Sequence, residues 1–158
     1  MKIKNLCFIT LVILLGALYG CSDNKKGFDE ENVTFNVVNS EATEEYKFYT
    51  IEIANNSGFN LTHLSLHLNY PIKTSKGSKS NPYVVEGKTD SSNRPINLIP
   101  GETITFSITA PIKEVFANSK LLDFEKPNIE LKGYYKDGEE EIPFGISGGI
   151  NVLILRGE

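Results

Sequence analysis

The run IEIANNSGFNLTHLSLHLNY, residues 51–70, contains two stretches in which every other side chain is apolar. A period of two places alternate side chains on opposite faces of a β-strand, whereas an amphipathic helix has a period of ~3.6 residues. Between the two stretches lies Asn55-Asn56-Ser57-Gly58, and Asn and Gly tolerate the positive φ angles of tight turns. The run therefore predicts two half-buried β-strands joined by a turn.

The same period recurs along the chain from Asn32 onward. Further strands are predicted at Val33–Val37, Thr103–Thr109, Ile129–Gly133 and, with less regular alternation, Ile150–Leu155. Asp137-Gly138 lies between two apolar stretches and predicts a hairpin. About seven short strands separated by turn residues are typical of an all-β fold, an antiparallel β-sandwich, here over residues 32–158.

One segment of the domain does not alternate. In Pro111–Lys120, PIKEVFANSK, a proline opens the segment and Ile112, Val115 and Phe116 recur at helical spacing. Proline is favoured in the first turn of a helix, and such spacing gives a helix one apolar side. We expect one short helical turn near 111–120 that bridges the sheets.

The 51–70 run, together with NLIPGETITFSI at 97–108, resembles the immunoglobulin-like domains of exported bacterial proteins, including the FxLYD type. In those domains a strand ends in an Asn-Asn-Ser-Gly-like turn, and a Pro-Gly-Glu turn opens a later strand. The resemblance covers residues 50–70 and 98–110. It implies an immunoglobulin-like β-sandwich in an extracytoplasmic setting, and it implies no activity and no functional residues.

The N-terminus has the pattern of a secretory signal. Met1–Asn5 carries two lysines, and Leu6–Tyr19 is apolar apart from Thr10, which matches the charged and apolar regions of a signal peptide. The apolar run is shorter than the ~20 helical residues needed to cross a hydrocarbon core ~30 Å thick. A transmembrane anchor shortened by tilt or by bilayer thinning is the alternative.

The end of that run, Leu18-Tyr19-Gly20-Cys21, resembles the lipobox of bacterial lipoproteins, although Tyr19 departs from the small or aliphatic residue usual there. The resemblance implies cleavage between Gly20 and Cys21, and a thioether-linked diacylglycerol, with acyl chains such as palmitate, on Cys21. The protein is then anchored to the outer face of the cell membrane or, with Ser22 in a two-membrane bacterium, to the outer membrane. The expected organisation is a signal peptide at 1–20, a flexible tether at 21–31 and the β-sandwich.

Composition fits an exported protein held by lipid. Residues 1–20 contain two lysines and no acid, so their removal lowers the formal net charge from −4 to −6. Nucleic-acid binding needs a clustered basic face, and anionic lipid attracts basic segments. We therefore expect no nucleic-acid partner and membrane contact through the N-terminal lipid. The two cysteines, Cys7 and Cys21, leave the mature domain without a free thiol or a disulfide.

Several polar residues are weighed as sites. His63 and His67 on one strand lie ~13 Å apart at ~3.3 Å per residue, too far to share an ion, so solvent-facing histidines and no metal site are expected. Glu139-Glu140-Glu141 is read as a charged edge that blocks strand aggregation, with weak divalent-cation binding as the alternative. Alternation places one of Tyr134 and Tyr135 in the core. The other tyrosine is exposed, and an alternative to a purely structural role is that it stacks on a sugar ring.

The 25 residues from Pro71 to Pro95 are the candidate binding loop. Long irregular connections in compact domains are often functional. Lys73, Lys76 and Lys79 give this loop local positive charge, and Tyr83 lies in a short apolar stretch at 82–85. An anionic cell-wall polymer or an acidic envelope protein is the expected partner, and a solvated, variable loop is the alternative.

We expect no catalytic residues and no cofactor. The serine-hydrolase pattern GxSxG, the metalloprotease pattern HExxH and the P-loop pattern GxxxxGK[ST] are expected to be missing. The predicted function is therefore a non-enzymatic binding or accessory module at the cell surface. A lipid-anchored envelope hydrolase and a passive envelope component are the alternatives.

Overall fold

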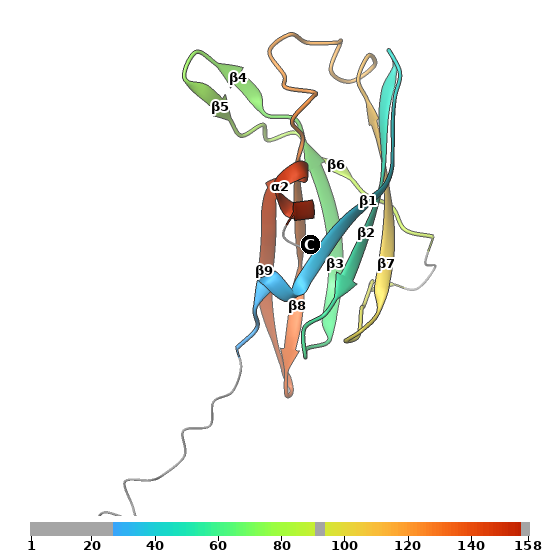
Figure 1. The fold of residues 1–158 in the computed structure, drawn as a ribbon, viewed down its shortest axis with the longest axis vertical. Helices are drawn as coiled ribbons and strands as arrows, with labels where there is room; N and C mark the ends of the chain where they lie inside the picture. Colours follow the sequence, from blue (N-terminus) through green and yellow to red (C-terminus); the bar gives the residue numbers. More distant parts are fainter. Residues whose placement is uncertain (1–26, 91–93, 156–158) are drawn as a thin grey trace, which may run out of the picture.

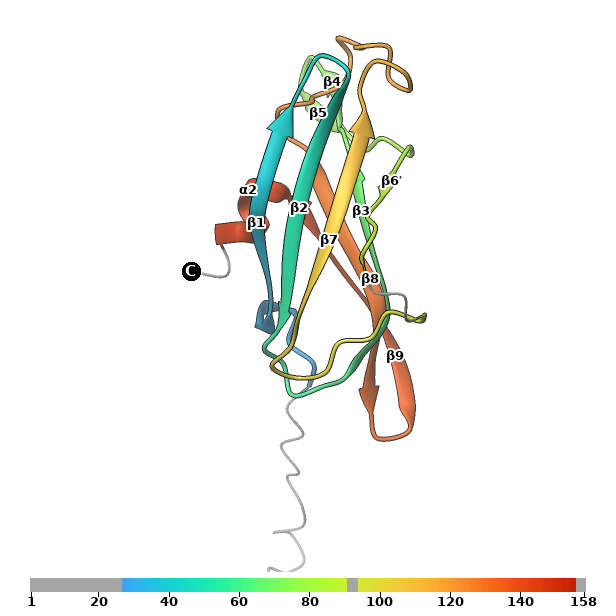
Figure 2. The same cartoon turned by 90° about the vertical axis from the view of Figure 1, so that its right-hand side faces the viewer.

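Two sheets of antiparallel strands face each other in the computed structural model, which describes residues 27–90 and 94–155 (Figure 1). Figure 2 looks onto the first sheet, with the second behind it. The predictions for the signal peptide (1–20), for Cys21 and for the tether up to residue 26 lie outside the described residues.

The first sheet has the order β1-β2-β7, made of Val33–Ala42, Tyr46–Asn55 and Thr103–Pro111. The second has the order β6-β3-β8-β9, made of Val85–Glu86, Leu61–Asn69, Asn128–Asp137 and Glu140–Gly149. A separate hairpin pairs β4 (Ile72–Thr74) with β5 (Gly77–Lys79). The chain crosses between the two sheets after β2, β6 and β7, as in immunoglobulin-like sandwiches. The predicted all-β, antiparallel sandwich is confirmed.

The core lies between the sheets and is built by the predicted alternation. Ile51 of β2 pairs with Phe106 of β7, and Leu131 of β8 with Leu66 of β3. Cross-strand partners project from the same face of a sheet, so each pair adds two side chains to one apolar layer. The fully buried aliphatic and aromatic residues of these strands include Ile51, Ile53, Leu66, Leu68, Phe106, Ile108, Ile129 and Leu131.

Strand β3 contains a bulge that the period of two does not predict. The register with β8 shifts between Thr62 and Ser65, and His63 has φ 53°. The extra residue lets Leu61 and Leu64 both face the core, although they are three positions apart. It also means that regular strand geometry does not connect His63 and His67.

The predicted C-terminal strand at Ile150–Leu155 is wrong. This segment instead forms the short helix α2 (Ile150–Ile154), which Figure 1 shows beside β1 and β9. Ile150 and Leu153 are its buried residues, and the i, i+3 spacing belongs to a helix. The amide of Ile150 donates to the carbonyl of Pro127, so the chain leaves β9 and folds over the open side of the sandwich.

The segment expected to form a helical turn near 111–120 makes a helix-like turn but no regular helix. The amide of Val115 donates to the carbonyl of Pro111, and the amide of Ala117 to that of Lys113, which is the i→i+4 spacing of a helical turn. Ala117 and Asn118 then adopt φ 48° and 50°. Left-handed residues cannot continue a right-handed helix, so the turn stops there.

The folded part of the chain begins within the predicted tether. The ring of Phe28 stacks on that of Tyr135 with centroids 4.5 Å apart, and it contacts Phe59 and Phe144. A 3₁₀ turn, η1 (Glu30–Asn32), then leads into β1. Since Phe28 fills an aromatic cluster at one end of the sandwich, the residues from Phe28 onward belong to the domain rather than to the predicted tether.

Candidate functional site

The candidate site lies at the end of the sandwich opposite to residue 27. In Figure 1 the described chain starts at the bottom, whereas the β4–β5 hairpin and the connection from β7 to β8 lie at the top. We call this end the distal end and define it by residues 71–84 and 112–122. Within the predicted loop Pro71–Pro95, the chain forms the β4–β5 hairpin and the short edge strand β6, and most other described residues lie outside regular strands.

An apolar hollow of about 350 Å³ opens at the distal end. Its lining comes from the hairpin, the residues before β6 and the 112–122 connection: Ile72, Asn81, Tyr83, Val115, Phe116, Ser119, Leu121 and Leu122. Tyr83 is 47% exposed and Leu121 is 67% exposed. Single exposed apolar residues are common on protein surfaces, but a cluster around a hollow is typical of a contact surface.

The floor of the hollow is a continuous aromatic cluster. Tyr83 packs edge-on against Phe116 at 5.1 Å, and Phe116 packs edge-on against Tyr70 at 5.6 Å. Phe124 contacts both Tyr70 and Phe116. The rings therefore connect the exposed Tyr83 to the fully buried Tyr70, and edge-to-face contacts between rings hold them in fixed orientations.

Hydrogen bonds fix the walls. Asn81 is buried, and its Nδ2 donates to the carbonyl of Tyr70 at 3.1 Å while its Oδ1 accepts from the amide of Tyr83 at 3.0 Å. The amide of Lys73 donates to the carbonyl of Leu121 at 2.7 Å. These bonds tie the two wall segments together before any partner arrives, so little ordering is needed on binding.

The hairpin distributes the three predicted lysines over different faces. Ile72 pairs with Lys79 and Lys73 with Ser78, and directly paired residues share a face. Ile72 lines the apolar hollow, whereas Ser78 lines a different hollow beside α2. Lys79 is therefore on the side of the apolar hollow and Lys73 on the other side. Lys76 lies in the turn between β4 and β5.

The charge of the distal end is mostly positive. Its residues, 71–84 and 112–122, contain five lysines (Lys73, Lys76, Lys79, Lys113 and Lys120) and one acid, Glu114. The whole chain, by contrast, has a formal net charge of −4. The sequence predicts the first three lysines and Tyr83 as site residues. It does not predict Val115, Phe116 and Lys120, which fall in the segment expected to form a turn, or Leu121, which follows that segment.

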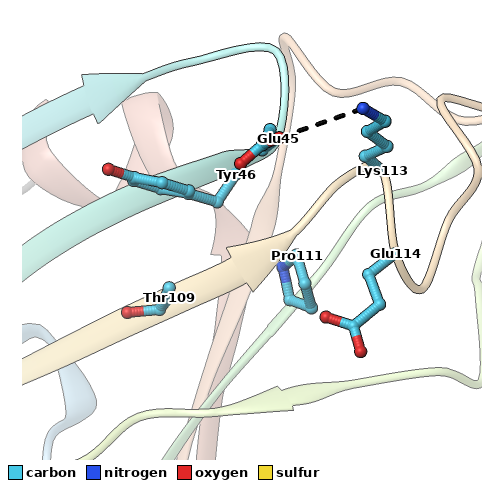
Figure 3. Close-up of a pocket in the computed structure, with 6 residues that line it drawn as sticks. All are labelled: Glu45, Tyr46, Thr109, Pro111, Lys113 and Glu114. Carbon is cyan, nitrogen blue, oxygen red and sulfur yellow. Dashed lines mark ion pairs between the residues drawn. The ribbon is translucent and has the colours of Figure 1, made fainter.

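A second, larger hollow of about 510 Å³ lies nearby (Figure 3). One side of this hollow is apolar with hydroxyl groups and consists of Tyr46, Thr109 and Pro111. On its rim, Glu45 and Lys113 form an ion pair at 3.9 Å. Both members of that pair are highly exposed, where an ion pair is worth ~0–1 kcal/mol. With Glu114 also present, this hollow has mixed charge and no aromatic floor.

Strand β9 contains a short motif of the kind found in serine hydrolases. GISGG at 145–149 matches the G-x-S-x-G pattern that surrounds the nucleophile of many serine hydrolases. The expectation that such motifs are missing is wrong here. In those enzymes the serine sits on a sharp turn between a strand and a helix, whereas Ser147 lies inside the strand and pairs with Glu130.

Glu130 in turn pairs with His67, so Ser147, Glu130 and His67 form a row across three strands. A catalytic triad needs the histidine between the serine and the acid, and here the acid is in the middle. Strands ~4.8 Å apart separate Ser147 from His67 by roughly 10 Å. Glu130 is paired with Lys132 at 2.9 Å. This row therefore lacks the geometry to activate Ser147 through His67.

The remaining predicted sites are dispersed. His63 is exposed and lies edge-on to Tyr134 at 5.8 Å, whereas Tyr135 packs in the aromatic cluster of Phe28. One tyrosine of the pair thus faces inward, as predicted. Glu141 pairs with Lys136 at 3.6 Å, next to the predicted hairpin, in which Gly138 has φ 66°.

Within residues 27–90 and 94–155, no group of three or more His, Cys, Asp or Glu side chains could hold a metal ion. None of the helices there has the length and apolar character that crossing a membrane requires.

Comparison with known proteins identifies no family. No family model matches the sequence, and no curated protein matches it. Among solved structures, selenomethionine-labelled β-glucosidase from Kluyveromyces marxianus matches with a TM-score of 0.35 and 14% identity. The match covers 74% of this chain and 15% of that chain. The chain therefore spans a small part of that enzyme's length, and so distant a likeness carries no functional argument.

Proposed function

We propose that the protein is a lipid-anchored extracytoplasmic lipoprotein whose sandwich is a non-enzymatic binding module. The observation that carries the binding role is the apolar, basic-rimmed hollow at the distal end. Support for the anchor comes from the lipobox-like residues Leu18–Cys21. A chain attached near residue 21 holds the end with Phe28 toward the membrane and leaves the distal end pointing away from it (Figure 1).

In this proposal the mechanism is local concentration. Two acyl chains on Cys21 give stable anchoring, whereas a single chain gives marginal, reversible binding. Anchoring confines the domain to a thin layer at the cell surface, which raises the effective concentration of the distal end for any partner in that layer. An envelope protein or a cell-wall polymer can then be held by contacts that are weak in free solution.

The anchor is tested by replacing Cys21 with Ser in the full chain in a bacterial host. We expect the parent in the membrane fraction, labelled by radioactive palmitate, and the Cys21→Ser chain without label. The variant is also expected to be depleted from the lipid-anchored pool but still folded, because the described core is built from residues between Val33 and Leu153. Equal palmitate labelling of both chains would contradict the proposed anchor.

The binding role is tested in cells with a photoreactive amino acid at Val115, which is exposed and lines the hollow. The matched position is Leu155, an exposed apolar residue after α2. A binding module predicts a dominant adduct from position 115 and little from 155. If neither position nor a scan of other exposed positions gives an adduct, the module is refuted in favour of a passive envelope component.

A further inference from the structure

We infer that the partner of the distal end is an acidic polypeptide segment that inserts one large apolar side chain into the hollow beside Tyr83. This inference rests on the proposed binding role and adds the chemical class of the partner. It chooses between the two candidates of that proposal, a cell-wall polymer and an envelope protein.

The walls of the hollow select for an apolar occupant. Five of the eight lining residues carry purely apolar side chains: Ile72, Val115, Phe116, Leu121 and Leu122. Sugar hydroxyls and phosphates need hydrogen-bond partners when they leave water, and these side chains offer none. An anionic polysaccharide or polyphosphate would therefore leave the hollow unfilled, whereas a leucine or phenylalanine side chain of a polypeptide fills it.

Two polar side chains of the walls, Asn81 and Ser119, make hydrogen bonds within the domain. Both side-chain polar atoms of Asn81 are bonded to the backbone, at Tyr70 and Tyr83. The hydroxyl of Ser119 accepts from the amide of Leu121 at 3.3 Å. These groups therefore hold the shape of the hollow, and specificity comes from apolar contact and from the charges outside it.

The rim selects for negative charge. Lys79 projects on the same face of the hairpin as Ile72, which lines the hollow, and Lys120 precedes Leu121. Lys76 lies in the turn of the same hairpin. The distal end as a whole has five lysines against one acid, Glu114. Complementary potential steers encounters and disfavours partners of like charge. An acidic segment is therefore favoured over a neutral or basic one.

A membrane surface also combines apolar and anionic groups, but the geometry favours a polypeptide. The apolar residues surround a hollow about 350 Å³ in size, which a protruding side chain fits better than a planar lipid layer. The hollow also lies at the end of the sandwich away from residue 27 (Figure 1). The proposed anchor, Cys21, precedes residue 27 in the sequence. The distal end thus faces away from the chain's own membrane.

Strength follows from the size of the contact. Burying one large aliphatic or aromatic side chain changes affinity by roughly 10- to 100-fold. The anchor residue and the rim charges together give a weak, reversible complex, and the shared surface layer raises its occupancy.

The test uses the full chain with the photoreactive residue at Val115 and analyses the adduct by mass spectrometry. We expect a crosslinked peptide with net negative charge whose linked residue is next to a large apolar side chain. Two variants probe the contacts: Lys79→Glu reverses the rim charge and Leu121→Asp spoils the apolar wall. Each is expected to lower the adduct yield at least fivefold.

Matched variants control for general effects. Lys88→Glu reverses the charge of an exposed lysine outside the rim. Leu155→Asp changes a leucine that is 68% exposed, against 67% for Leu121. Both are expected to keep the yield within twofold of the parent. Because all four side chains are exposed, unchanged thermal unfolding of each variant verifies that the fold is intact.

Other outcomes overturn the inference in distinguishable ways. A carbohydrate, polyphosphate or lipid adduct at position 115 refutes the polypeptide partner but leaves the binding module standing. Two other results also refute the inference alone. One is an adduct with a basic peptide, and the other is an adduct yield that Lys79→Glu and Leu121→Asp do not lower. No adduct at any exposed position refutes the inference and the proposed function together.

Discussion

Asn55 shows how much of the fold depends on one buried polar side chain. Its Oδ1 accepts from the amide and the hydroxyl of Ser57, at 3.1 and 2.6 Å. Its Nδ2 donates to the carbonyls of Phe59 and Leu98, at 2.9 and 3.0 Å. Asn55 is fully buried, so it joins the end of β2, the turn before β3 and the segment before β7 without contact with water.

Replacing Asn55 by Ala should cost about 2–4 kcal/mol in the free energy of unfolding, because it leaves buried donors and acceptors unpaired. Asn56→Ala is the matched control. Asn56 is exposed and its side chain makes one bond, to Thr34 at 3.2 Å, so we expect a change within ~0.5 kcal/mol. Urea unfolding of the purified protein measures both. Similar losses in the two variants would contradict this role of Asn55.

The buried hydroxyl of Tyr70 makes the free energy of unfolding depend on pH in the alkaline range. Its side chain is fully buried, and its hydroxyl lies beside Tyr49. Burial, with a smaller contribution from Tyr49, raises the pKa of the Tyr70 hydroxyl far above its ordinary value. The unfolded chain, with an ordinary tyrosine pKa near ~10, releases this proton first. The stabilising effect is therefore complete below about pH 10 and is lost as the pH rises beyond it.

Tyr70→Phe should remove this component of the pH dependence. A proton released only by the unfolded chain contributes a slope of ~1.4 kcal/mol per pH unit above pH ~10. The parent should therefore lose stability more steeply than Tyr70→Phe when unfolding is measured from pH 8 to 11. The exposed Tyr83→Phe serves as control and should follow the parent. Parallel curves for the parent and Tyr70→Phe would refute the prediction.

At the scale of elements, the bulge in β3 determines which residue its neighbour in β8 can carry. A Cβ added at Gly133 would lie 2.8 Å from the carbonyl oxygen of Thr62 and 2.8 Å from Cδ2 of Leu64. Thr62 is held by its pairing with Tyr134 next to the bulge. The backbone at this point therefore cannot move away without breaking the register.

Gly133→Ala should accordingly destabilise the protein by about 1–3 kcal/mol, the usual cost of overpacking. Gly145 pairs with Lys132 in the adjacent strand, and a Cβ there would meet no atom within 4 Å. Gly145→Ala should therefore lie within ~0.5 kcal/mol of the parent. Thermal or urea unfolding compares the two variants, and equal stabilities would show that the backbone of β3 yields.

The elements that the sequence predicts are those that local patterns determine. Alternation locates the strands around Ile51 and Ile129, and Asp137-Gly138 locates the hairpin, because each depends on neighbouring residues. The bulge at His63 and the helix at Ile150–Ile154 depend on contacts with distant strands, so an alternation pattern misses the first and misassigns the second. The bond from Asn55 to Leu98, 43 positions away, lies beyond any local pattern for the same reason.

At the scale of the molecule, the sequence predicts half of the candidate site. Lys73, Lys76, Lys79 and Tyr83 stand out as a basic and aromatic stretch in an acidic chain. The other half, Val115 to Leu121, is brought beside Tyr83 by the pairing of Ile72 with Leu122 and by the contact of Tyr83 with Phe116. Because the paired residues Ile72 and Leu122 are far apart in the sequence, with β6 and β7 between them, composition alone gives no sign that these segments form one surface.

The central claim is that the distal end is covered by a partner in the living cell. Hydroxyl-radical footprinting tests it most directly, since it measures side-chain exposure in intact cells and in the purified, detergent-solubilised full chain. Tyr83 and Leu121 report on the distal hollow, and Tyr134, 40% exposed, and Leu155, 68% exposed, are matched residues elsewhere. We predict that labelling of Tyr83 and Leu121 falls severalfold in cells while labelling of Tyr134 and Leu155 changes little. Equal labelling of the distal residues in both settings would contradict the claim.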